Sequence, residues 1–188
     1  QVDLSIVIDE GEKIRIRDLI LRGNKHLGGL WLRMKLSNQG SWFIFDNYYD
    51  DRTFETDLRT VEAAYRDAGY LDATARRGEF IYDSSKAVVS PVIEITEGER
   101  YTVSAVEVRG ATMFSREELL APFQRMIGKP YNGERFADAL ATARGLYGRQ
   151  GFVDNDLDAR FEKNADARTI VLVIEVMEAP GVRVGSVR

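Results

Sequence analysis

The stretch "IEITEGERYTVSAVEVRGA", Ile93–Ala111, decides the fold because close copies of it occur elsewhere in the chain. One copy, "IVIDEGEKIRIRDLILRGN" (Ile6–Asn24), precedes it, and a partial copy, "IEVMEAPGVRVGSVR" (Ile174–Arg188), follows. Self-similarity at a regular offset is the signature of repeated structural units. Two complete units therefore fit within the 188 residues, flanked by pieces of two others.

A second repeated piece lies between these copies and predicts a long helix in each unit. "FETDLRTVEAAYRDAGY" (Phe54–Tyr70) matches "FADALATARGLYGRQGF" (Phe136–Phe152). Apolar residues recur at spacings of four, three and four, which places them on one face of a helix and in the core. The stripe consists of Phe54, Leu58, Val61 and Tyr65 in one copy and Phe136, Leu140, Ala143 and Tyr147 in the other.

A shorter helix is expected before each long one. In the second unit Ser115 is followed three residues later by Glu118, the pattern of a capping box at a helix start. Pro122 must shorten or bend that helix. The equivalent helix of the first unit, about Leu27–Leu36, is weakened by two adjacent glycines.

Two strands should follow the long helix. "YLDATARR" (Tyr70–Arg77) and "VDNDLDARF" (Val153–Phe161) alternate apolar with charged residues, as half-exposed strands do. "TIVLVIEVM" (Thr169–Met177) is almost continuously apolar, so we place the last strand at the sheet centre and the polar strand at an edge. In the first unit, Pro91 should make the last strand begin at or just after it, or bulge there.

Each unit thus reads strand, helix, helix, strand, strand, an α+β module with a three-stranded mixed sheet covered on one face by two helices. The first strand spaces its apolar residues by two and then three, as in Tyr101, Val103 and Val106. Either a bulge lies there, or the first pair faces the preceding module. The predicted boundaries are 1–11 for the last strand of a preceding module, 12–98 and 99–179 for the complete modules, and 180–188 for the start of the next.

Composition excludes several classes of function. With 44% hydrophobic and 30% charged residues the chain is an ordinary globular mixture without an apolar window long enough for a membrane helix. The net charge of −4 argues against broad attraction to nucleic acid or anionic lipid. Without cysteine, and with His26 as the single histidine, catalytic triads and zinc motifs cannot be assembled. We expect no enzyme activity and no cofactor.

An acidic row offers the nearest approach to a metal motif. Asp154, Asp156 and Asp158 resemble the start of a calcium loop. Ala159 stands where that loop needs glycine and Ala165 where it needs glutamate, so we expect no metal site.

The ordered set of motifs resembles tandem POTRA modules, the periplasmic repeats of BamA-type outer-membrane barrel-assembly proteins. The residues that carry the resemblance are "ITEGERYTVSAVEVRG", "GKPYNGERF", "YRDAGY" and "YGRQGF". The resemblance implies a scaffold and receptor for unfolded outer-membrane proteins, periplasmic chaperones and accessory lipoproteins, located in the periplasmic portion of an outer-membrane protein of a Gram-negative-type bacterium. Since the chain begins at Gln1, we expect a fragment, monomeric and itself outside the bilayer.

Three alternatives stay open from the sequence. One is the POTRA region of a related secretion transporter. Another is a tandem nucleic-acid-binding module, which would want a basic stripe or a glycine-bracketed phosphate loop. The weakest is a hydrolase built on a carboxylate pair, which no spacing marks out.

Strand addition suggests the first candidate binding residues. An edge strand offers unpaired main-chain groups, and an unfolded barrel client is made of strands that need such partners. The Asp154, Asp156 and Asp158 row would guard the edge of the second unit, so we expect the first unit to hold the better site. Its candidate residues are Leu71, Asp72, Ala73, Thr74, Ala75 and Arg76.

The aromatic run "SWFIFDNYYDD" (Ser41–Asp51) suggests the others, because it falls in an insertion that the second unit lacks. We expect two of its first three aromatics, Trp42, Phe43 and Phe45, to cap the core, and at least one of Tyr48 and Tyr49 to stay exposed. Trp42, Tyr48 and Tyr49 therefore complete the candidate partner-binding residues.

Overall fold

The computed structural model describes residues 14–37, 48–84, 88–150 and 156–178. Their contacts divide the chain into two compact units. Unit 1 comprises Gln1–Glu62 and Thr74–Thr96, and unit 2 comprises Ala63–Ala73 and Glu97–Arg188. The module boundaries predicted from the repeat stay a prediction.

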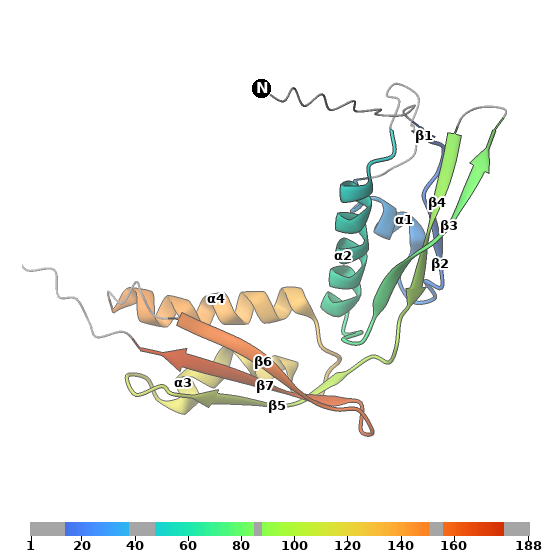
Figure 1. Cartoon of the computed structure of the whole chain (residues 1–188). Coiled ribbons are helices and arrows are strands. Elements are labelled where there is room, and N and C mark those ends of the chain that lie inside the picture. The colour runs from blue at the N-terminus through green and yellow to red at the C-terminus, as the bar shows by residue number, and fades with distance from the viewer. Residues whose placement is uncertain (1–13, 38–47, 85–87, 151–155, 179–188) are drawn as a thin grey trace, which may run out of the picture. The chain divides into compact units, whose positions relative to one another are not determined.

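The last strand lies at the centre of the unit 1 sheet, as predicted. β4 (Val88–Thr96) pairs in parallel with β1 (Arg15–Ile16) and β2 (Ile20–Arg22), and in antiparallel fashion with β3 (Thr74–Asp83) on its other side. The short helix α1 (Gly29–Arg33) and the long helix α2 (Asp51–Asp67) lie on one face of this sheet (Figure 1). β3 therefore forms an edge.

Unit 2 repeats this arrangement. β7 (Thr169–Met177) lies between β5 (Thr102–Arg109), which is parallel to it, and β6 (Asp156–Asn164), which is antiparallel. α3, the 3-10 helix η1 and α4 pack on the strands through a single core cluster. Their bounds are Arg116–Leu120, Ala121–Met126 and Gly133–Arg149. The predicted strand, helix, helix, strand, strand order is confirmed in both units.

Local signals set the helices as expected. Ser115 Oγ accepts from the Glu118 N–H, and the Glu118 carboxylate accepts from the Ser115 N–H, so the capping box is confirmed. The α-helix ends before Pro122 and continues as η1, the predicted shortening. In unit 1 the glycine-weakened helix is shorter than predicted, Gly29–Arg33.

The apolar stripes of both long helices lie in the core. Phe54, Leu58, Val61 and Tyr65 of α2 are buried. In α4, Ala143 and Tyr147 are buried, while Phe136 and Leu140 are partly buried against the same core.

A bulge explains the irregular spacing in the first strand of unit 2. The pairing of β5 with β7 shifts register between Val103 and Ala105. Tyr101, Val103 and Val106 are all buried in the core of unit 2. The bulge is therefore the correct alternative there, and a first pair facing the preceding module is wrong.

Pro91 interrupts the neighbours of β4 rather than β4 itself. The strand runs through Pro91, so the prediction that it begins there is wrong. β1 pairs with Val88 and Val89 and β2 begins opposite Val92, which leaves the first strand broken where Pro91 has no N–H to offer. On the other side, β3 shifts register between Arg77 and Phe80, so the predicted irregularity is present in the partner strand.

β3 differs from the predicted strand at both ends. The sequence pattern suggested Tyr70–Arg77, whereas β3 spans Thr74–Asp83. Tyr70 N–H donates to Tyr65 O over 2.9 Å and Ala73 N–H to Tyr70 O over 3.2 Å, so the segment before β3 forms turns. The alternation of apolar and charged residues extends across these turns, so the sequence pattern placed the start of the strand too early.

Two glycines hold matching positions after the first strand of each unit. Gly23 has φ +91° and Gly110 has φ +82°, both in the left-handed region. A Cβ on Gly23 would lie 2.0 Å from Ile95 O, and one on Gly110 would lie 2.4 Å from Val176 O. The first strand can therefore leave the sheet beside the last strand only through glycine.

We expect Gly110→Ala to lower the free energy of unfolding of unit 2 by at least about 2 kcal/mol, because strain and a backbone clash add. Gly128→Ala is the matched control: Gly128 has φ +75°, but its Cβ would meet no atom within 4 Å. It should cost only roughly 1 kcal/mol. Urea unfolding followed by circular dichroism measures both, and equal losses would contradict the clash.

Candidate functional site: the open edge of β3

The register of β3 shows which of its main-chain groups point away from the sheet. Ala75 N–H donates to Glu62 Oε1 over 3.0 Å rather than to β4, so Ala75 points outward. Val89 of β4 accepts from the Arg17 N–H over 2.8 Å and so faces the first strand. Tyr82 pairs with Val89, and Phe80 pairs with Pro91, which lies two residues further along β4 and faces the same way as Val89. The N–H and C=O groups of Tyr82 and Phe80 therefore point away from β4.

Three adjacent apolar side chains accompany this open end. Phe80, Ile81 and Tyr82 are 40%, 44% and 57% exposed. The Phe80 ring rests edge-on against Tyr49, with centroids 5.1 Å apart, which fixes its direction. Within the described residues, no hydrogen bond covers the outward main-chain groups of Phe80 and Tyr82. This end of β3 is open for pairing.

Sequence reasoning missed these three residues. The run "GEFIYD" is rich in the aromatic and β-branched residues that favour strands, and it was the signal that could have found them.

Side chains of unit 2 occupy part of the edge of β6, at Leu157 and Ala159. Asp158 Oδ1 accepts from the Ala159 N–H over 2.8 Å, and Arg144 Nη2 donates to the Leu157 carbonyl over 2.8 Å. A donor and an acceptor of this edge are thus occupied. Asp154 lies outside the described residues, and the side chain of Asp156 is not described either.

Three of the six predicted edge residues precede β3. Asp72 accepts hydrogen bonds from the Tyr101 hydroxyl over 2.5 Å and from Lys163 Nζ, both in unit 2. The Lys163 and Tyr101 bonds hold the pKa of the Asp72 carboxyl below its usual range. Leu71 packs against the core of unit 2, and Ala73 closes the turn.

The other three, Thr74, Ala75 and Arg76, begin β3. Ala75 is buried and its N–H is bonded to Glu62, so the guarded end of the strand lies here. The open part of the edge therefore lies nearer Tyr82 than the sequence predicted.

The two tyrosines of the aromatic run separate. Tyr48 is 43% exposed, which confirms that at least one of the pair stays exposed. The Tyr49 N–H donates to Ile14 O over 2.9 Å, and its hydroxyl donates to Asp51 Oδ1 over 2.8 Å. Burial and this bond raise the pKa of Tyr49 to about 12. Trp42, Phe43 and Phe45 lie outside the described residues.

An arginine joins β3 to α2 beside the site. Arg77 forms ion pairs with Asp51 and Glu55, each over 2.7 Å, and its guanidinium lies 5.3 Å from the Phe54 ring centroid. The bond from Arg77, followed by that from Tyr49, lowers the pKa of the Asp51 carboxyl. β3 is thereby held against the helix layer before its open end begins.

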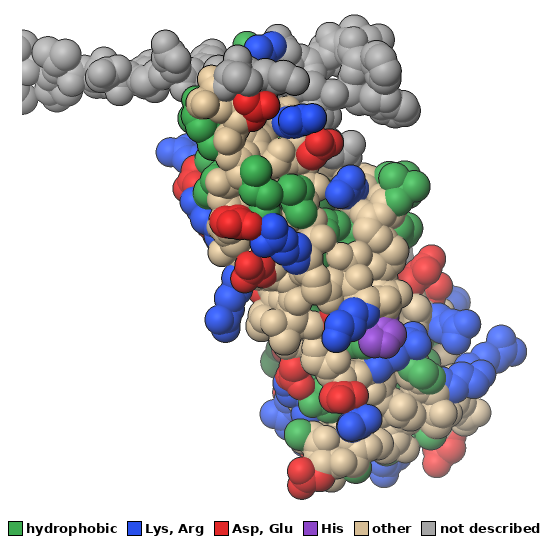
Figure 2. All heavy atoms as spheres, turned by 90° about the vertical axis from the view of Figure 1, so that its right-hand side faces the viewer, with side chains coloured by type: hydrophobic (Ala, Val, Ile, Leu, Met, Phe, Trp, Pro, Cys, Tyr) green, Lys and Arg blue, Asp and Glu red, His purple; other side chains and the backbone are tan. Residues whose placement is uncertain are grey.

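The described residues offer little support for other chemistry. Among them, no group of three or more acidic or histidine side chains could hold a metal ion. On the face drawn in Figure 2, basic and acidic side chains are interspersed over the described surface rather than gathered into a basic stripe. None of the described helices has the length and apolarity to cross a membrane.

Comparison with known proteins points to the same kind of repeated module as the fold does. The POTRA family model, described as surface antigen variable number repeat, matches residues 101–179. A putative outer membrane protein assembly factor of Treponema pallidum is 26% identical over 181 residues, and BamA of Neisseria meningitidis serogroup B is 24% identical over 181. Each alignment covers 94% of this chain. Residues 101–179 thus match a POTRA domain, and the chain is similar over nearly its whole length to BamA-like outer membrane protein assembly factors.

The solved structure of POTRA domains 3–5 of Haemophilus influenzae BamA has the same fold. It superimposes with a TM-score of 0.68 at 17% identity, covering 94% of this chain and 70% of that one. The chain spans 22% and 23% of the length of the two curated relatives.

We expect Tyr49→Ser to lower the free energy of unfolding of unit 1 by roughly 1–2 kcal/mol, below the ~3–5 kcal/mol of a fully buried aromatic ring. The Tyr49 ring contacts Phe54 and Phe80, and its hydroxyl bonds to Asp51. Tyr48→Ser serves as the control and should change stability by less than about 0.5 kcal/mol. Thermal unfolding measures both, and equal effects would show that the pair acts as one surface.

Asp72→Asn tests the Tyr101 and Lys163 contacts. A carboxyl whose pKa is lowered by folding stabilises the protein at pH values above its pKa in the unfolded state. This stabilisation is lost as the pH falls through its pKa in the folded state. We expect the variant to be less stable by roughly 0.5–1 kcal/mol near pH 7, since the side chain is partly exposed.

This difference should shrink below about pH 4. Asp166→Asn removes the same charge and is the control. A difference between wild type and Asp72→Asn that persisted unchanged at low pH would contradict the assignment.

Proposed function

We propose that this chain belongs to the periplasmic receptor and scaffold of an outer membrane protein assembly factor, and that unfolded barrel clients bind the edge of β3 by strand addition. The observation that carries the proposal is the open end of β3, where Phe80 and Tyr82 point main-chain groups outward. The names of both curated relatives, outer membrane protein assembly factors, support the class of client.

The geometry of the edge suits weak, sequence-tolerant binding. Outward N–H and C=O groups of Phe80 and Tyr82 pair with the client backbone, each hydrogen bond contributing about 0.5–1.5 kcal/mol. Side chains of barrel strands alternate between apolar and polar. An apolar client residue can therefore lie against Phe80 or Tyr82 while the polar residues face water.

Two features of β3 before its open end limit the length of a client strand that can pair with it. Glu62 occupies the Ala75 N–H, and the register shift between Arg77 and Phe80 breaks the regular ladder. Bulges bend a strand and increase its twist. A client strand is thus held over a short segment, which favours release.

Side-chain contacts hold β3 in place next to its open end. Arg77 ties β3 to α2 through Asp51 and Glu55, and Tyr49 supports the Phe80 ring from the helix side. Less conformational entropy is lost on binding when the receptor edge is already ordered.

Chaperones and accessory lipoproteins are the further partners that we propose. On α1, Leu30 and Met34 are largely exposed and Trp31 is partly so. These side chains give an accessory protein an apolar surface apart from the β3 edge.

Tyr82→Pro tests the proposal, because it removes an outward N–H without removing a bond to β4. Tyr82→Ala is the matched control, since it loses the same side chain and keeps the N–H. The probe is a fluorescein-labelled peptide of about ten residues with the alternating pattern of a barrel strand. We expect wild type and Tyr82→Ala to bind it and Tyr82→Pro to bind at least about tenfold more weakly.

Two controls separate the alternatives. The same peptide with alternate amides N-methylated should not bind, because strand addition needs its N–H groups. Equal binding by Tyr82→Pro and Tyr82→Ala would overturn the edge as the site. Tight, salt-sensitive binding of oligonucleotides without peptide binding would overturn the scaffold function itself.

A further inference from the structure

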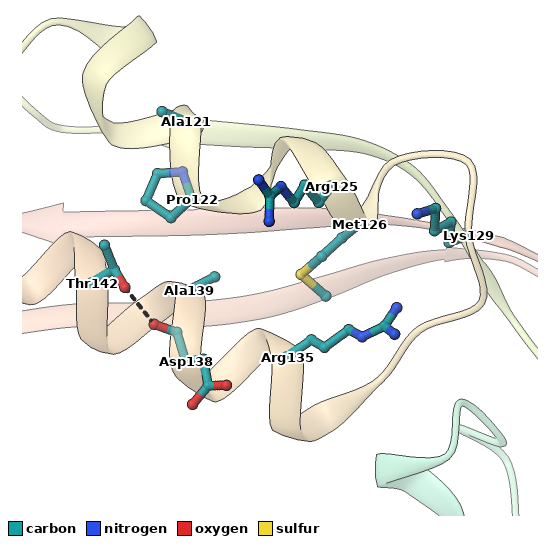
Figure 3. A pocket seen from close by; sticks show the side chains of 9 residues that line it. All are labelled: Ala121, Pro122, Arg125, Met126, Lys129, Arg135, Asp138, Ala139 and Thr142. Atoms are coloured by element: carbon teal, nitrogen blue, oxygen red, sulfur yellow. Dashed lines mark hydrogen bonds between the residues drawn. The ribbon is translucent and has the colours of Figure 1, made fainter.

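Unit 2 contains a cavity of about 610 Å³ between η1 and α4 that the strand-addition edge does not use. Its floor is apolar: Met126 reaches from η1 towards α4, and Ala139 and Pro122 lie beside it (Figure 3). Met126 and Ala139 are each 5% exposed and belong to the core of the unit. The floor is therefore fixed by core packing.

Three cations stand around this floor. Arg125 comes from η1, Lys129 from the following loop and Arg135 from the first turn of α4 (Figure 3). All three are exposed, and among the described residues none of them forms an ion pair. Asp138 is the single acid in the lining. The lining therefore has a local excess of positive charge in a chain of net charge −4.

The backbone holds the cations in place. Val103 N–H donates to Lys129 O over 2.9 Å, and Lys129 N–H donates to Met126 O over 3.1 Å. Asn132 caps α4 by accepting from the Arg135 N–H over 2.8 Å. The backbone positions of Lys129 and Arg135 are thus set by the fold, and their side chains can both reach an anionic ligand in the cavity.

We propose that this cavity binds an acidic segment of a partner protein, with an aliphatic side chain on the Met126 floor and carboxylates beside Arg125, Lys129 and Arg135. The volume lies within the ~300–1,000 Å³ of binding pockets, enough for a few side chains. Because the cations are spread along an open rim, they match carboxylates distributed along a peptide better than a single buried anion.

Charge complementarity and shape decide between classes of partner. A membrane surface would meet a projecting basic face, whereas these cations border a hollow. Nucleic acid would need a basic stripe, which three cations do not make. The proposal stands independently of strand addition at β3, since it rests on other residues in the other unit.

The test is fluorescence anisotropy with the whole 188-residue chain. The probe is a labelled peptide of alternating Glu and Leu, compared with an otherwise identical peptide of alternating Gln and Leu. We expect the acidic peptide to bind at least about tenfold more tightly, and the difference to fall between about 0.05 M and about 0.5 M salt.

The variant Arg125→Glu/Arg135→Glu should remove this preference. The matched control is Arg116→Glu/Arg149→Glu, which changes the net charge equally at exposed positions of the same unit outside the cavity. Circular dichroism checks folding, and Arg125→Gln/Arg135→Gln replaces the first variant if charge reversal prevents it. Tyr82→Pro should bind the acidic peptide as wild type does.

Three results would overturn the proposal. They are equal binding of the Glu and Gln peptides, equal weakening by the control variant, and binding of phosphatidylglycerol vesicles through Arg125 and Arg135 without binding of the peptide. Loss of acidic-peptide binding in Tyr82→Pro would instead assign the peptide to β3 and equally overturn it.

Discussion

The last strand of each unit is the constraint on which the rest of the structure depends. β4 and β7 pair on both sides, so each must satisfy two rows of backbone groups inside the core. Their apolar composition makes that position favourable. With the centre fixed, the first strand can only lie on one side and the second on the other. The second strand of each unit is left as an edge.

One proline in that central position distinguishes the two edges. Pro91 has no N–H to offer the first strand, which breaks opposite it, and on the other side β3 shifts register just before Phe80, the residue that pairs with Pro91. In unit 2, where β7 carries no proline, β6 pairs with β7 without a shift from Asp156 to Asn164. The irregular edge is also the one with exposed apolar residues, so a local backbone defect and a candidate binding surface coincide.

The sequence predicts what depends on local spacing. Helix stripes, the Ser115 capping box and the central last strand all follow from residues close together in the chain. The sequence does not predict which residues from distant parts of the chain contact a given side chain. Asp72 looked like a solvent-facing strand residue, but it is bound by Tyr101 and Lys163, which lie far along the sequence. The sequence could not say which of Tyr48 and Tyr49 is exposed, because Phe80, which it assigned to no element, supports the Tyr49 ring.

Comparing the two copies separates features of the fold from features of one unit. The Tyr65 hydroxyl donates to Glu97 over 2.7 Å, and the matching Tyr147 donates to Glu178 over 2.9 Å, so this helix-to-strand bond belongs to the fold. Although burial raises the pKa of Glu178, hydrogen bonds from Thr112, Met113 and Tyr147 bring it to about 2, which keeps the acceptor charged.

Other features occur in one copy alone. Arg77, which ties β3 to α2 through ion pairs, aligns with Ala159 of β6, whose side chain carries no charge. Arg135 beside the basic cavity aligns with Thr53, whose hydroxyl donates to Asp50 over 2.6 Å. Because neither feature is needed to form the common fold, each is free to serve a partner of its own unit. The two units therefore share a scaffold and differ where a ligand would touch them.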